Sequence, residues 1–136
     1  MSTGQHAELI AAAKKVRENA QAQFSGFKVG AALRSRGGRI YTGCNIENAT
    51  YGLTVCAERV AIFKALSEGE PPGGFEAMAV VADTEAPTPP CGACRQLLWE
   101  FCGEIPIVLA TLKGSTEEYR TSALLPKAFD ARFFRH

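Results

Sequence analysis

The first regular pattern of hydrophobic positions in the chain is helical. Apolar residues recur about three to four positions apart, with charged residues between them, at Leu9, Ala13, Val16 and Ala20. This spacing predicts an amphipathic helix over residues 6–21 that packs one apolar stripe against the core. His6 lies at the start of this helix and is expected on the surface.

The spacing then changes to alternation. Phe27, Val29, Ala31 and Leu33 occupy every second position, which predicts a strand that begins near Phe27. Gly37 and Gly38 predict a tight turn, and residues 39–43 then form the returning strand of a hairpin.

The rest of the chain predicts alternating helices and strands. Two further helices are expected, at residues 56–68 and 91–102, each followed by a glycine that can end it. The first of these has apolar residues almost all round, so it should be largely buried. Three further strands are expected, at residues 77–82, 105–110 and, as a short edge strand, 119–121.

This order of elements predicts the fold class. Because strand–helix–strand crossovers are right-handed and give parallel neighbours, the helices must lie on the faces of a mixed sheet. We therefore expect an α/β fold, a three-layer α/β/α sandwich with a five-stranded sheet, formed by residues 1–136 as a single domain.

Charge and composition exclude several function classes. The net charge of +1 argues against a basic surface for nucleic acid or membrane. No apolar run reaches the roughly 18 residues of a spanning helix and no signal-peptide core is present, so a cytoplasmic protein is expected. Five cysteines in such a chain favour thiols kept reduced for metal binding or catalysis over disulfides.

Three of these cysteines occur where predicted helices begin. Cys91 and Cys94 are one helical turn apart, and Cys56 opens the other helix. The positive end of a helix favours thiolate, and zinc requires thiolate, so a three-cysteine zinc site is predicted. Arg59, one turn after Cys56, is expected to donate hydrogen bonds to the sulfurs and to offset part of their negative charge.

Glu58 indicates whether such a site is catalytic. It lies two positions after Cys56, where a carboxylate can reach water above the metal, take its proton and return it to a substrate. Two alternatives remain open at this point: a redox Cys-x-x-Cys pair, and a closed structural zinc site with Cys44 as the fourth ligand. Cys102 is too far along the helix from Cys94, about 12 Å, to be that ligand.

These motifs resemble the cytidine deaminase family, in its small, homotetrameric, three-cysteine form. The resemblance rests on Cys56-Ala57-Glu58 and Pro90-Cys91-Gly92-Ala93-Cys94, and it extends through residues 27–33, 43–49 and 124–126. One departure is Gln23-Phe24, where the family often has Pro-Tyr, so a tyrosine hydroxyl is lost.

The resemblance implies a function and a set of site residues. It implies zinc-dependent hydrolytic deamination of cytidine and deoxycytidine in pyrimidine salvage, with one zinc ion per subunit held by Cys56, Cys91 and Cys94. Glu58 is implied as the proton shuttle, with Arg59 beside the ligands. The implied substrate-binding residues are Asn45 and Glu47 on the ribose, Phe27 on the pyrimidine, the Ala57 backbone near the amino group, and Ala49, Tyr51 and Phe129, which reach a neighbouring subunit's site in a tetramer.

Two other functions compete with this one. A relative acting on a modified cytosine nucleoside, of the blasticidin type or substituted at N4, would have the same motifs. A zinc-stapled interaction module without turnover would need a fourth ligand. Deaminases of tRNA or DNA bases are disfavoured, because they usually have histidine as the first ligand and need a strand-binding surface.

Overall fold

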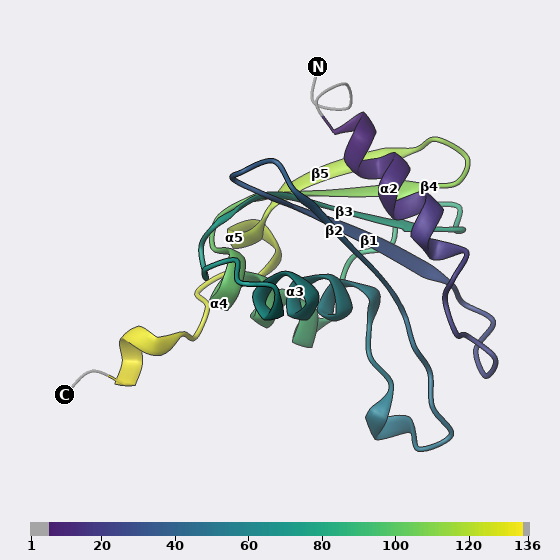
Figure 1. The fold of residues 1–136 in the computed structure, drawn as a ribbon, viewed down its shortest axis with the longest axis horizontal. Coiled ribbons are helices and arrows are strands. Elements are labelled where there is room, and N and C mark those ends of the chain that lie inside the picture. The colour runs from purple at the N-terminus through teal and green to yellow at the C-terminus, as the bar shows by residue number, and fades with distance from the viewer. Residues whose placement is uncertain (1–5, 135–136) are drawn as a thin grey trace.

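The computed structural model describes residues 6–134 and confirms the predicted α/β fold, with a mixed five-stranded sheet and helices on both faces (Figure 1). The strand order is β2-β1-β3-β4-β5. The strands are β1 Val29–Ser35, β2 Ile40–Cys44, β3 Phe75–Ala82, β4 Pro106–Thr111 and β5 Thr116–Arg120. The helices are α2 Ala7–Arg17, α3 Ala57–Ser67, α4 Gly92–Cys102 and α5 Thr121–Leu124, with short 3₁₀ turns η1 at Tyr51–Leu53 and η2 at Ala131–Phe134.

The strand directions bring several carboxyl ends to one edge of the sheet. β1 is antiparallel to both β2 and β3, and β3 is parallel to β4. Hence β2, β3 and β4 all run the same way. Gly30 of β1 pairs with Cys44 at the end of β2, and Val29 pairs with Ala82 at the end of β3. The segments that leave β2 and β3 therefore begin on either side of the start of β1.

The helices divide the core into two layers. On one face α2 buries Leu9 and Ala13 against β1, β3 and β4. On the other face α3 and α4 share a larger cluster with the sheet, which includes Ala61, Ile62 and Leu98. The face covered by α3 and α4 is the one on which the candidate site is built.

Gly43 allows α3 to approach the sheet closely. A Cβ added at Gly43 would lie 2.5 Å from the carbonyl oxygen of Ala57 and 2.5 Å from the backbone nitrogen of Ala61. Both atoms belong to the backbone of α3, which cannot move aside as a flexible side chain can. The short distance between β2 and the first turns of α3 therefore requires a residue without a side chain at position 43.

Several predicted details were wrong. The first helix ends at Arg17 rather than at residue 21. His6, expected on the surface, is only 6% exposed, because it lies against β5: its Nε2 is 3.7 Å from the carboxylate of Glu118. The helix at 57–67 is buried on one side only, and Phe63 is exposed. The edge strand β5 begins three residues earlier than predicted, at Thr116.

None of the helices in residues 6–134 combines the length and the apolar character that crossing a membrane would require.

Replacing Gly43 with alanine should lower the free energy of unfolding by at least about 2 kcal/mol, because the new methyl group would push α3 off the sheet. Urea unfolding at fixed protein and zinc concentrations measures this. Gly37→Ala is the matched control, since a Cβ there meets only the Ser35 hydroxyl, at 3.8 Å. Equal stability of the two variants would contradict the close approach.

Candidate metal centre and active site

Three thiols meet where α3 and α4 begin. Cys56 and Cys91 are the N-cap residues of these helices, both with extended backbone, and Cys94 lies in the first turn of α4. The sulfur of Cys91 is 3.9 Å from that of Cys56 and 3.4 Å from that of Cys94. All three sulfurs lie within 4.8 Å of one another, and within residues 6–134 they form the one such group of potential metal ligands.

This donor set fits zinc. Thiolate sulfur is a preferred zinc ligand, and three protein ligands leave the fourth tetrahedral position for water or substrate, as in catalytic sites. Cys44 does not join the cluster; it is a buried residue at the end of β2. Cys102 is buried at the far end of α4. The closed four-cysteine alternative therefore lacks its fourth cysteine in the part of the chain that the structure describes.

Arg59 contacts the cluster as predicted from its position on α3. Its Nη2 donates to the sulfur of Cys56 at 3.5 Å and to the carbonyl oxygen of Thr54 at 3.4 Å. The pKa of Cys56 is lowered to about 5, first by a hydrogen bond from the thiol of Cys94 and then by the hydrogen bond and charge of Arg59. The pKa of Cys94 is raised in turn, because its proton is held between the sulfurs. Negative charge in the cluster is thus concentrated on Cys56, beside the guanidinium.

Glu58 is a buried carboxyl group in the first turn of α3. It is 5% exposed, and the pKa of its carboxyl group is raised to about 7, first by burial and next by the negative charge of Cys56. Such a group can both hold and release a proton near neutral pH. This is the property that a proton carrier between water and a substrate requires.

A cavity of about 320 Å³ lies over the thiols and Glu58. Its lining includes several residues predicted to bind substrate or metal, namely Phe27, Asn45, Cys56, Ala57, Glu58 and Cys91. Sequence reasoning missed the remaining walls, formed by Val29, Thr54, Val55, Val80, Thr88 and Pro89. No local pattern marks these residues, because they come from four separate segments that meet only in the folded chain.

Asn45 and Glu47 hold the segment that leads into β1. The side-chain amide of Asn45 accepts from the backbone N–H of Val29 at 2.9 Å and donates to the carbonyl of Phe27 at 2.8 Å. One carboxylate oxygen of Glu47 accepts from the backbone N–H groups of Phe24 and Ser25, at 3.0 Å each, and the other accepts from the Ser25 hydroxyl. These bonds, led by the one from the Ser25 hydroxyl, lower the pKa of Glu47.

Besides Glu47, three predicted substrate-binding residues are absent from the lining of this cavity. Ala49 and Tyr51 belong to a segment between β2 and α3 that projects from the body of the molecule, and Phe129 lies on the C-terminal segment, which extends away from the sheet (Figure 1). Tyr51 is 75% exposed and Phe129 is 56% exposed. Within one chain these side chains do not reach the thiols.

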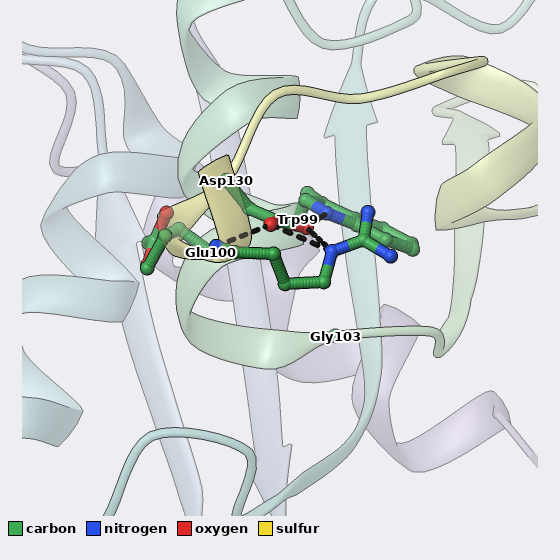
Figure 2. Close-up of a pocket in the computed structure, with 6 residues that line it drawn as sticks. Trp99, Glu100, Gly103 and Asp130 are labelled. Atoms are coloured by element: carbon green, nitrogen blue, oxygen red, sulfur yellow. Dashed lines mark hydrogen bonds and ion pairs between the residues drawn. The ribbon is translucent and has the colours of Figure 1, made fainter. Parts of the chain in front are cut away.

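A second hollow, of about 400 Å³, lies between α4 and the C-terminal segment and is lined by Trp99, Glu100, Gly103, Asp130, Ala131 and Arg132 (Figure 2). Its central carboxylate is already bonded: Asp130 accepts from Nε of Arg132 at 2.8 Å and from the indole N–H of Trp99 at 2.9 Å. These bonds, first that of Arg132, lower the pKa of Asp130 to about 2. The hollow therefore contains neither thiols nor a buried carboxyl group like that of Glu58, and its other carboxylate, Glu100, is exposed.

Comparison with known proteins identifies relatives of this arrangement. Residues 3–110 match the family model described as the cytidine and deoxycytidylate deaminase zinc-binding region. Cytidine deaminase of Sporosarcina psychrophila is 56% identical over 123 residues, 90% of this chain and 89% of that protein. The crystal structure of cytidine deaminase from Burkholderia pseudomallei superposes with a TM-score of 0.90 at 50% identity and covers 91% of this chain and 98% of its own. Blasticidin-S deaminase of Bacillus cereus is 30% identical over 106 residues, 72% of this chain and 74% of that protein.

Cysteine substitutions should separate an open from a closed metal site. Cys44→Ser should keep about one zinc ion per chain, because the Cys44 side chain is outside the thiol cluster. Cys91→Ser should lose most of the metal, since an alcohol is a poor zinc ligand. Elemental analysis of the purified variants measures both. Loss of zinc from Cys44→Ser would mean that a fourth cysteine closes the site.

Proposed function

The chain belongs to the family of cytidine and deoxycytidylate deaminases, and from this premise we propose that it deaminates cytidine and deoxycytidine by zinc-dependent hydrolysis, giving the uracil nucleosides and ammonia. The observation that carries the proposal is the shared cavity: thiols of the metal site, the buried Glu58 carboxyl group and Phe27 all line it. Cys56, Cys91 and Cys94 would hold the ion, whose chemistry is to lower the pKa of a water molecule toward neutrality.

Glu58 carries the protons of the reaction. Its carboxylate takes a proton from the attacking water and passes it to N3 of cytosine while oxygen bonds to C4. It then takes the second proton of that water and gives it to the amino group, so that the C4–N bond breaks and ammonia leaves. The two protons of one water molecule are thus accounted for. A carboxyl group whose pKa is about 7 is suited to both transfers.

Arg59 tunes the metal site in this proposal. Three thiolates on one zinc ion would leave the site with an excess of negative charge. That excess would weaken the ability of the ion to lower the pKa of a water molecule. The contact of Arg59 with the sulfur of Cys56 removes part of that excess. Ala57 lines the same cavity, which supports the proposal that its backbone contacts the substrate amino group.

Asn45, Glu47 and Phe27 select a free nucleoside. After its bonds to Val29 and Phe27, the Asn45 amide still has one N–H and one lone pair to offer a sugar hydroxyl, and the Glu47 carboxylate retains acceptor capacity. A carboxylate in this place would repel a 5′-phosphate, which favours nucleosides over nucleotides. Phe27 presents an apolar ring to the pyrimidine.

The active unit is a homotetramer in this proposal. The exposure of Tyr51 and Phe129 on projecting segments supports it, because a second copy would both cover their apolar surface and bring Ala49, Tyr51 and Phe129 to its own cavity. We place the enzyme in pyrimidine salvage in the cytoplasm, where free thiols and nucleosides coexist. The weaker similarity to blasticidin-S deaminase makes modified cytosine nucleosides the second candidate substrates.

Replacing Glu58 with glutamine should retain zinc but lower kcat for cytidine by about 10³-fold, because the amide cannot carry protons. The assay follows the loss of cytidine absorbance together with ammonia release, with and without a metal chelator. Glu100→Gln, an exposed position on α4, is the control and should leave kcat unchanged. Turnover by Glu58→Gln within tenfold of the unmodified enzyme would refute the proton-carrier role.

Replacing Glu47 with alanine should raise KM for cytidine by at least tenfold while changing any activity on free cytosine little, since only the nucleoside has a sugar to bind. Glu104→Ala is a close control, because Glu104 accepts from the N–H and hydroxyl of Ser122 much as Glu47 does from Ser25, but it lines a different hollow, with Arg36 and Phe75. Equal effects of Glu47→Ala on both substrates would remove the sugar-binding assignment.

A further inference from the structure

The loop that delivers Cys91 to the metal site has little backbone support of its own. Residues 84–90 lie in the connection between β3 and α4 and contain Pro87, Pro89 and Pro90, which have no N–H to donate. In the described part of the chain, this loop makes no backbone-to-backbone hydrogen bond. Pro90, immediately before the ligand, is fully buried. The position of Cys91 therefore depends on contacts made by side chains.

Arg95 supplies the hydrogen bond that this loop lacks. Its Nε donates to the carbonyl oxygen of Pro90 at 2.8 Å. Long side chains on a helix point back toward its N-terminus, which is how a residue in α4 reaches the peptide that precedes the helix. The bond fixes the peptide group that joins Pro90 to Cys91. This peptide group includes the backbone nitrogen of Cys91, the proposed metal ligand.

The same guanidinium also holds a distant segment. Nη1 of Arg95 donates to the carbonyl oxygen of Leu124 at 3.0 Å, at the end of α5. Two more residues of α4 continue this attachment: Gln96 donates to the carbonyl of Phe129 at 2.8 Å, and Trp99 donates to Asp130 at 2.9 Å (Figure 2). The C-terminal segment is thus fastened along α4, with Arg95 at the end nearest the metal ligands.

The position of Arg95 near the N-terminus of α4 does not stabilise the helix itself. A cation near a helix N-terminus is disfavoured by the helix dipole. Arg95 occupies such a position and is half-buried. The two carbonyl acceptors offset that cost, and the planar fork of arginine is the side chain that can reach both at once.

We propose that Arg95 is a positioning residue of the zinc site, which holds the Pro90–Cys91 peptide so that the Cys91 sulfur stays directed at the metal and which ties this peptide to the C-terminal segment at Leu124. The inference rests on the proposed function, because it presumes that the three thiols bind zinc. Without the bond from Nε, the Pro90 carbonyl is released and the Cys91 sulfur leaves the metal more often. Zinc then dissociates faster.

The test compares Arg95→Gln and Arg95→Lys with Arg120→Lys. The control also removes a guanidinium bond to a backbone carbonyl, that of Arg120 to Glu104 at 3.1 Å, but far from the thiols. Zinc release to a chromogenic chelator is timed for each folded protein. Cobalt is then substituted, and its ligand-field and sulfur-to-cobalt absorption bands report the geometry and number of bound thiolates.

Arg95→Gln should release zinc at least tenfold faster and show altered cobalt bands, Arg95→Lys should be intermediate, and Arg120→Lys should match the unmodified enzyme. Release rates and spectra of both Arg95 variants within twofold of the unmodified enzyme would overturn the proposal, as would an equal acceleration in Arg120→Lys. If Arg95→Gln does not fold, Arg95→Lys decides by the same criteria. Failure of the proposed function would look different, since the unmodified enzyme would then lack zinc or turnover.

Discussion

The meeting of two helix N-termini is the constraint on which this protein depends. The positive ends of α3 and α4 converge until the sulfurs of Cys56 and Cys91, their N-cap residues, are 3.9 Å apart. Two such ends would repel each other unless negative charge lay between them. Thiolates supply that charge, and zinc in turn requires thiolates. The arrangement is unfavourable for Glu58, because burial beside this negative charge destabilises its ionised form.

The sheet makes this meeting possible. Because β1 is antiparallel to both of its neighbours, β2 and β3 end at the same edge, and the helices that follow them start on the same face. Gly43 sets how closely α3 lies on the sheet. The segment that leads into β1 carries Phe27, and with Val29 it brings the hydrogen-bond partners of Asn45 to the same edge. The three thiols, the buried Glu58 carboxyl group and the residues proposed to bind the nucleoside thus come from different segments but share one boundary of the sheet.

Much of this could be predicted from residue patterns. The alternation around residues 27–33, the apolar run of β3 and the glycine after α4 located those elements to within a few residues, because each pattern reflects local backbone geometry. The errors arose where distant segments decide burial. His6 is buried, with its Nε2 3.7 Å from the carboxylate of Glu118 on β5, although a surface position was expected from its residue type. Phe63 is exposed although apolar residues occur almost all round its helix, because only one side of α3 faces the sheet.

The sequence by itself determined the chemistry: thiols one helical turn apart, a carboxylate two positions after another thiol, and an arginine one turn further on. Those relations are local, because the geometry of a helix fixes how side chains at a given spacing are directed. Only the tertiary structure decided that Cys44 stays out of the cluster, that Thr88 and Val80 complete the cavity, and that Arg95 reaches Pro90 and Leu124. These contacts join segments far apart in the chain, and their distances follow from strand register and helix packing rather than from any nearby residue pattern.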